Sequence, residues 1–159
     1  MTFDPCVGTH RGAAWWDRFF LGLAKYISSA SKDPSTQTGA VIVRPDRTIA
    51  SVGFNGFPRG TNDDPALYAN RDVKLSRIVH CEMNAILHAR ESLHGYILYT
   101  WPFCSCDRCA VHVIQAGIAK CVAPKLPANL EERWGKSVQS AIEIFQEAGI
   151  ILTQVEMES

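Results

Sequence analysis

The chain has 159 residues, the size of one ordinary domain, and 47% of them are apolar while 20% are charged. Sixteen basic residues balance sixteen acidic ones, so no global positive field is available to hold a long nucleic acid. No run of about eighteen apolar residues is present to span a bilayer, and residues 1–5 lack the character of a signal peptide. We therefore expect residues 1–159 to form one soluble, cytoplasmic domain that binds neither long nucleic acid nor membrane.

The first half of the chain predicts a helix, a hairpin and a long loop. Apolar residues recur at helical spacing from Ala14 to Ile27, which indicates an amphipathic helix. Segments 38–44 and 48–54 are rich in β-branched residues and are joined by turn formers at 45–47, which predicts two paired strands. From residue 55 to about residue 78 the sequence begins with turn formers and is then polar and weakly patterned, so we predict a long loop.

The second half alternates between helix and strand patterns. The predicted elements are helix 81–91, strand 96–100, helix 107–116 with Gly117 as its C-cap, strand 118–123, helix 132–148 and strand 150–155. This alternation predicts an α/β fold in which helices cover a sheet that begins with an antiparallel hairpin and continues with parallel strands.

Cysteines are concentrated in one short segment. The six are Cys6, Cys81, Cys104, Cys106, Cys109 and Cys121. Three of them fall within six positions, which is a poor disulfide framework for a domain of this size. In a reducing compartment such a cluster favours metal binding.

Two predicted helices begin with residues that suit zinc. His80 and Glu82 open one helix, Cys106 and Cys109 open the next, and a strand runs between them, so the two helix N-termini are expected to converge. One imidazole and two thiolates leave the fourth tetrahedral position open, as in catalytic rather than structural zinc sites. Glu82 is then placed to take a proton from water, pass it to a ring nitrogen and protonate a leaving amine.

Each of these motifs has another interpretation when taken alone. The C-x-x-C pair is also found in redox or structural sites, and His80 would also serve as a hydrogen-bonded core histidine. The combination of the two motifs favours catalytic Zn²⁺.

With these residues the sequence resembles the cytidine and deoxycytidylate deaminase superfamily, whose motifs are H-x-E and P-C-x-x-C. The resemblance covers about residues 16–120, and segments 32–41, 53–60 and 113–118 are most similar to the deoxycytidylate branch. It implies a three-layer α/β/α fold with a five-stranded mixed sheet flanked by helices. It also implies zinc-dependent hydrolysis of a small nucleotide, dCMP, to dUMP with release of ammonia.

The resemblance further implies roles for substrate-binding residues. Asn55 is expected to hydrogen-bond the sugar or the base, and the backbone beside Cys81 is expected to fix the pyrimidine ring. A phosphate needs cations or helix-end amides, and Lys32 and Arg59 are candidates because each lies on a motif loop. The alternative is that both are solvated surface charges.

Several positions depart from the family pattern. Ser105 stands where the family has proline, and the preceding segment is one residue longer, which makes Cys104 an alternative ligand. We favour Cys106, because C-x-x-C followed by Ala110 and a helix fits the motif. The family's aromatic residue after the next strand is not evident, and Trp134 is a candidate replacement.

Other functions use the same residues. The same chemistry would serve another cytosine nucleotide or nucleoside, a modified base or a base in RNA. A non-catalytic zinc-binding module would require an exposed Glu82 and a fourth protein ligand, for which Cys104 is the candidate. The predicted first helix carries four aromatic residues, Trp15, Trp16, Phe19 and Phe20, more apolar surface than one helix face buries, and this favours a homo-oligomer.

Overall fold

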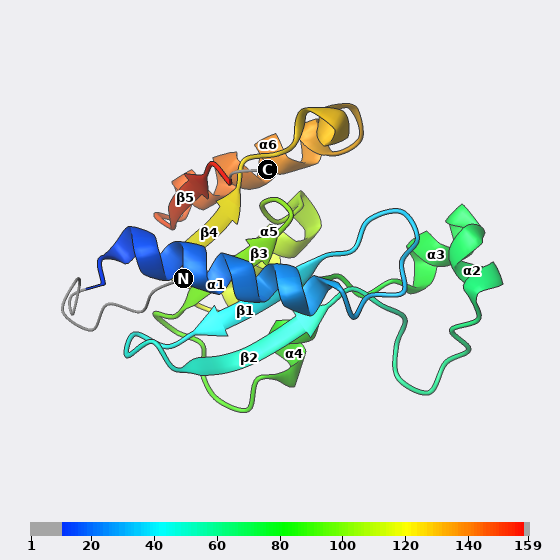
Figure 1. Cartoon of the computed structure of the whole chain (residues 1–159), viewed down its shortest axis with the longest axis horizontal. Coiled ribbons are helices and arrows are strands. Elements are labelled where there is room, and N and C mark those ends of the chain that lie inside the picture. Colours follow the sequence, from blue (N-terminus) through cyan, green and yellow to red (C-terminus); the bar gives the residue numbers. More distant parts are fainter. Residues whose placement is uncertain (1–10, 158–159) are drawn as a thin grey trace, which may run out of the picture.

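The computed structural model describes residues 11–157, so Cys6 lies outside the described part (Figure 1). The helices are α1 (Ala13–Ser28), α2 (Pro65–Ala69), α3 (Arg71–Arg77), α4 (Cys81–His88), α5 (Asp107–Gln115), the short 3-10 helix η1 (Ala128–Leu130) and α6 (Glu131–Glu147). The strands are β1 (Gly39–Val43), β2 (Ile49–Phe54), β3 (Ile97–Trp101), β4 (Lys120–Pro124) and β5 (Ile151–Val155).

The strands form one mixed sheet in the order β2-β1-β3-β4-β5. β1 is antiparallel to both neighbours, with Val41 opposite Val52 of β2 and Tyr99 of β3. β4 is parallel to β3 and to β5. The predicted hairpin and the predicted parallel strands are confirmed, and β1 joins the two parts.

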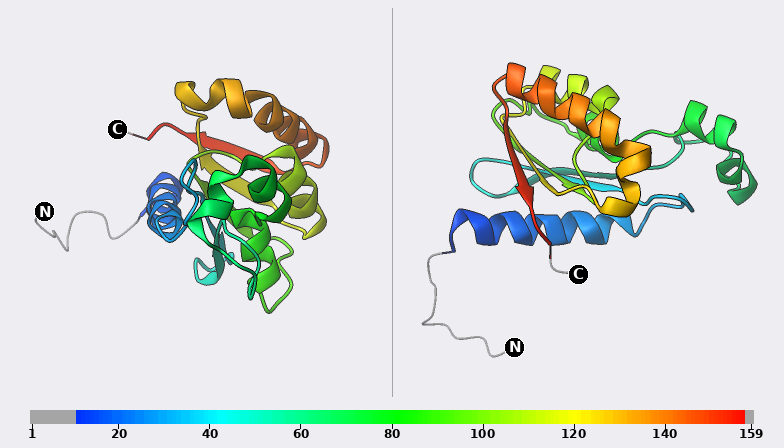
Figure 2. Two further views of the ribbon diagram at one scale, coloured as in Figure 1. Left: turned by 90° about the vertical axis from the view of Figure 1, so that its right-hand side faces the viewer. Right: turned by 90° about the horizontal axis from the view of Figure 1, so that it is seen from above.

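Helix α1 covers one face of the sheet (Figure 2). Its buried side chains, among them Phe20 and Leu21, pack against Val41 and Val43 of β1 and Tyr99 of β3. Burial of these apolar side chains holds α1 on the sheet.

Helices α4, α5 and α6 cover the opposite face, where a larger apolar cluster lies. The helices contribute Cys81, Ala85, Ala110, Val113, Val138, Ala141 and Phe145 to this cluster. Because alternate strand residues point to opposite faces, the same strands supply both clusters. The predicted three-layer α/β/α fold is thereby confirmed.

Two glycines allow helices to approach the β1–β2 hairpin closely. A Cβ atom at Gly39 would lie 2.7 Å from the amide nitrogen of Ser28 on α1. A Cβ atom at Gly53 would lie 2.5 Å from the amide nitrogen of Ala85 and would also collide with the carbonyl oxygen of Cys81 on α4. Only glycine therefore allows this spacing, which sets the position of α4 and of the residues on its first turn.

The prediction of a continuous loop from 55 to 78 is wrong, because α2 and α3 lie within it. Side-chain caps start both helices: the Asp64 carboxylate accepts from the Ala66 amide at 2.8 Å, and Asn70 Oδ1 accepts from the Val73 amide at 3.2 Å. Figure 1 shows the two helices extending away from the sheet.

Two predicted element boundaries also shift. α4 ends at His88 rather than at residue 91, because the backbone of Ala89 is extended. Strand β4 begins at Lys120 rather than at residue 118, since Gly117, with φ 86°, ends the preceding helical segment in the left-handed conformation that its prediction as a C-cap implied. Within the described part of the chain, none of the helices has the length and apolar character that crossing a membrane requires.

Candidate active site

The metal donors lie at the starts of two helices. His80 is the N-cap residue of α4 and Cys106 is the N-cap residue of α5, while Cys109 lies in the first turn of α5. The predicted convergence of the two helix N-termini is therefore present. Their positive ends favour negatively charged ligands at this point.

The donor atoms are close enough to share one ion. His80 Nδ1 lies 3.4 Å from Cys106 Sγ and 3.3 Å from Cys109 Sγ, and the three donor atoms lie within 4.8 Å of one another. Tetrahedral zinc with bonds of about 2.05 Å to nitrogen and 2.3 Å to sulfur would separate these atoms by about 3.5 Å. No other histidine, cysteine or carboxylate of residues 11–157 belongs to this group. The donors therefore fit a zinc site with an open fourth position.

The two thiols of this site have unequal acidity. A hydrogen bond from Cys109 and the neighbouring His80 imidazole lower the pKa of Cys106 below its usual range. The pKa of Cys109 is raised by its hydrogen bond to Cys106 and by burial. Metal binding requires both cysteines as thiolates, so it releases any proton that the pair holds.

Cys104 does not join the donors. It is buried in the apolar cluster with 2% of its surface exposed, and burial raises its pKa to about 12. The adjacent Ser105 is buried as well. The structure thus brings Cys106, and not Cys104, to His80.

Glu82 lies in the first turn of α4 and is 6% exposed. It lines the same cavity as His80 and Cys106. The Cys81 thiol donates a hydrogen bond to Glu82 Oε2 at 3.3 Å, and burial raises the pKa of that thiol. A buried Glu82 is the opposite of what the non-catalytic alternative requires.

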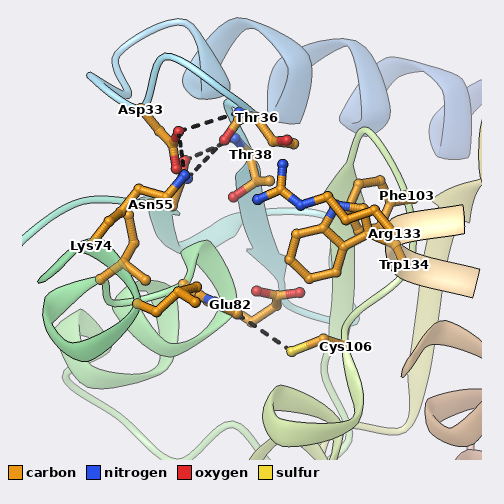
Figure 3. Close-up of a pocket in the computed structure, with 13 residues that line it drawn as sticks. Asp33, Thr36, Thr38, Asn55, Lys74, Glu82, Phe103, Cys106, Arg133 and Trp134 are labelled. Carbon is orange, nitrogen blue, oxygen red and sulfur yellow. Dashed lines mark hydrogen bonds and ion pairs between the residues drawn. The ribbon is translucent and has the colours of Figure 1, made fainter. Parts of the chain in front are cut away.

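The cavity above the metal donors is shown in Figure 3. Its walls come from the loop before β1, the end of β2, α3, the start of α4, the segment before α5 and the start of α6. It is lined by Asp33, Thr36, Thr38, Asn55, Lys74, Leu75, Ile78, His80, Glu82, Phe103, Cys106, Arg133 and Trp134. The cavity is therefore assembled around Glu82 and two of the three metal donors.

Asn55 lines this cavity, but its amide is engaged by the neighbouring loop. Its Oδ1 accepts from the Thr38 amide at 2.9 Å, and its Nδ2 donates to the Thr36 carbonyl at 2.9 Å and to Asp33 Oδ2 at 3.4 Å. These bonds hold residues 33–38 against the end of β2. In the structure Asn55 shapes the cavity wall, and its contact with substrate stays a prediction.

The two cations that the sequence suggested for phosphate binding do not line the cavity. Lys32 is paired with Asp63, and Arg59 hydrogen-bonds His88 Nε2 at 2.8 Å. Their predicted role is therefore without geometric support in this structure.

Two other cations line the cavity and were not predicted. Lys74 belongs to the segment that the sequence predicts to be a loop, and Arg133 lies at the start of the last helix. Neither is part of a recognisable motif. The only local indication is that Arg133 precedes Trp134, the aromatic residue that the sequence offers as a candidate for the site.

Trp134 forms part of the wall of the cavity. Its ring lies edge-on to His80 with centroids 6.5 Å apart, and 5.3 Å from the ring of Phe103. The position suits an aromatic wall beside a ring-shaped ligand. A contact with substrate remains a prediction for this residue.

The fold and the donor set define a three-layer α/β protein with an open metal site, which is the arrangement of a metal-dependent hydrolase. The sequence identifies the family within this class of hydrolases. The chain belongs to the cytidine and deoxycytidylate deaminase family, because the family model of the zinc-binding region matches residues 14–125. It is therefore a deaminase with zinc as its metal.

Two relatives illustrate this membership. An uncharacterized deaminase from Aliivibrio fischeri is 39% identical over 143 residues, which cover 90% of this chain and 95% of the relative. Deoxycytidylate deaminase from Mus musculus is 34% identical over 113 residues, or 67% of this chain. The match spans 63% of the mouse enzyme's length.

Solved structures share the fold. The dCMP deaminase from cyanophage S-TIM5, determined in complex with dCMP and dUMP, superposes with a TM-score of 0.67 at 19% identity, covering 92% of this chain and all (100%) of that one. Guanine deaminase from Nitrosomonas europaea gives a TM-score of 0.55 at 14% identity, covering 91% of this chain and 77% of that one. At these identities the likeness establishes the architecture alone.

Proposed function

We propose that this chain converts dCMP and water to dUMP and ammonia. The observation that carries the proposal is the placement of a buried carboxylate, Glu82, in the same cavity as His80 and Cys106. The similarity to deoxycytidylate deaminases such as the mouse enzyme favours a cytosine nucleotide over other substrates.

When bound by His80, Cys106 and Cys109, zinc acidifies water and so supplies the nucleophile for hydrolysis. Glu82 accepts the proton that this water loses and delivers it to N3 of the cytosine ring. The same carboxylate then takes the second proton of that water from the new hydroxyl group on C4 and carries it to the departing amine. C4 thus gains a bond to oxygen and loses its bond to nitrogen, and ammonia leaves.

The residues around Glu82 favour its role in proton transfer. The Cys81 thiol donates to one oxygen of the carboxylate, which leaves the other oxygen free to take up a proton. Phe103 and Trp134 line the same cavity with apolar surface and limit the access of bulk water. Proton transfer is thereby directed between Glu82 and the substrate.

We infer that residues 1–159 form one deaminase domain, that it assembles into a homo-oligomer, and that it works in the cytoplasm. A reducing compartment keeps the metal-binding thiols available, which supports this location.

Replacement of Glu82 tests the proposal. In Glu82→Gln the amide keeps the size of the side chain but cannot shuttle protons, so we predict a loss of turnover of about 10²- to 10⁴-fold. Zinc content should stay unchanged, because Glu82 is not among the three donors. The measurement is ammonia release from dCMP together with zinc content of the same sample.

The matched control is Glu147→Gln, which changes an exposed glutamate at the end of α6. It should retain full activity. Substantial turnover by zinc-loaded Glu82→Gln would contradict the assigned role. The same assay with CMP, deoxycytidine, cytidine and modified cytosines decides among substrates, and release from none of them would favour the binding-module alternative.

A further inference from the structure

The two cations that line the cavity differ in what they are paired with. Lys74 is buried, and its Nζ lies 3.1 Å from Asp33 Oδ1, so the two charges compensate each other. Arg133 takes part in none of the ion pairs found among residues 11–157. Of these two charges, that of Arg133 is therefore the one left for a ligand.

The guanidinium of Arg133 is directed into the cavity. Figure 3 shows it extending from α6 toward Thr36 and Thr38, on the far side of the Trp134 ring from Glu82 and Cys106. The guanidinium carbon of Arg133 lies 5.3 Å from the centroid of the Trp134 ring, a cation–π contact that holds the side chain along the Trp134 wall of the cavity.

A hydroxyl near the same end of the cavity lacks a hydrogen-bond partner. Thr36 Oγ1 is buried and bonds to no atom of the described chain. A buried polar group without a partner is costly, so a ligand that supplies an acceptor is favoured there. An arginine and an unpaired hydroxyl together suit an anion with several oxygen acceptors.

We propose that Arg133 and Thr36 form the subsite for the phosphate of the substrate nucleotide. A phosphate monoester carries a charge of about −1.5 to −2 at neutral pH, and the guanidinium matches both its charge and its geometry. The inference rests on the proposed function, since it places the reacting ring beside Glu82 and the phosphate beyond Trp134.

Consequently, α6 sets the preference for nucleotide over nucleoside. Arg133 lies outside residues 14–125, the part that matches the family's zinc-binding region. Of the two subsite residues, Thr36 lies within the matched part together with the metal donors and Glu82, whereas Arg133 is supplied by a later part of the chain.

Arg133→Gln is the direct test, with dCMP and deoxycytidine as paired substrates. We expect kcat/KM for dCMP to fall about 10- to 100-fold, mainly through KM, because a charged hydrogen bond is lost. For deoxycytidine, which has no phosphate, kcat/KM should be unchanged. Arg133→Lys should restore part of the loss, and Thr36→Val should lower kcat/KM for dCMP about fivefold.

Lys136→Gln is the matched control, because it removes an exposed positive charge from the same helix outside the cavity. It should change kcat/KM for neither dCMP nor deoxycytidine. An equal loss for both substrates in Arg133→Gln would overturn the subsite. A loss confined to dCMP in Lys32→Gln or Arg59→Gln, with Arg133→Gln unaffected, would also overturn it.

A binding measurement separates this inference from the proposed function. Zinc-loaded Glu82→Gln is titrated calorimetrically with dUMP and deoxyuridine, with and without Arg133→Gln. The subsite predicts weaker binding of dUMP alone, by about 10-fold or more. If the wild type deaminates no cytosine nucleotide, the proposed function fails, whereas binding still decides the subsite. If dCMP is deaminated and Arg133→Gln changes neither dUMP binding nor substrate preference, only the subsite fails.

Discussion

Cysteines that are neighbours in the sequence differ sharply in their environments. Cys106 lies beside His80, and Cys109 and the imidazole lower its pKa, whereas burial raises the pKa of Cys104 to about 12. A thiolate is the form that binds metal. The extra residue before the C-x-x-C motif therefore adds a core side chain, and it does not add a ligand.

Zinc content should separate these two roles. We predict that Cys106→Ser purifies with almost no zinc, because only two donors remain. Cys104→Ala should keep a full complement and lose only stability, by about 1 kcal/mol, through the small cavity it leaves. Metal analysis after gel filtration and urea unfolding measure the two effects. Loss of zinc from folded Cys104→Ala would contradict the assignment.

The residues of the site differ in how far the sequence could predict them. His80, Cys106 and Cys109 belong to compact motifs at helix starts, where spacing alone restricts the geometry. Lys74 and Arg133 reach the cavity through the packing of distant elements, which local patterns do not encode. The candidates Lys32 and Arg59 were close to motifs in sequence, but their side chains find partners elsewhere.

At the scale of elements, one polar cluster fastens α1 to the sheet. Asp17 of α1 is buried, accepts a hydrogen bond from the Tyr99 hydroxyl of β3 at 2.9 Å, and lies 3.3 Å from Lys120 Nζ of β4. Burial and the hydrogen bond to Asp17 raise the pKa of Tyr99. The cluster thus connects one helix to two strands.

This cluster gives stability a specific dependence on pH. The pKa of an unfolded tyrosine is about 10, whereas folded Tyr99 keeps its proton to higher pH. The stabilisation is complete below the unfolded pKa and is lost as pH rises through the folded one. We predict that Tyr99→Phe is about 1 kcal/mol less stable at neutral pH and declines less steeply above about pH 10. Urea unfolding of both proteins from about pH 7 to 11 measures this; parallel curves would contradict it.

Strong patterns predicted elements well, and weak patterns did not. The amphipathic spacing of α1 and α6 and the β-branched hairpin fixed these elements to within about two residues. Helices α2 and α3 are short and lack an apolar period, so only their capping residues, Asp64 and Asn70, distinguished them from a loop. The end of α4 depends on the backbone turning at Ala89, a conformation that its sequence does not dictate.

At the scale of the whole molecule, α1 presents aromatic residues to solvent as well as to the sheet. Trp15 is 40% exposed and Phe19 47% exposed, and their rings stack with centroids 5.3 Å apart. Tyr26, on the same helix, is 76% exposed. Exposed aromatic surface of this kind favours self-association.

We predict that the protein elutes as an oligomer and that Phe19→Glu shifts it toward the single chain. A charge at the centre of an apolar contact would have to be buried without a partner, which weakens association. Light scattering coupled to gel filtration gives the mass of each form, and Arg18→Gln, which makes the same change in net charge at a neighbouring exposed position, controls for altered charge alone. A wild-type protein of single-chain mass would contradict the prediction.

The overall architecture followed from the alternation of helices and strands, but the strand order did not. The sequence predicts which segments pair in the hairpin, while the position of β1 between β2 and β3 depends on contacts across the whole sheet. The layering of helices on the sheet is determined by which faces of the elements are apolar. The order of the strands is determined by how these elements pack together.

The close approach at Gly53 brings β2 and α4 into direct backbone contact beside the active site. α4 rests on β2 with no room for even a methyl group, and His80 and Glu82 are carried at the start of α4, whereas the two cysteine ligands are carried by α5. Any side chain at this position has to push one half of the metal centre away from the other. The spacing between His80 and the two cysteines therefore depends on Gly53, a residue that has no side chain.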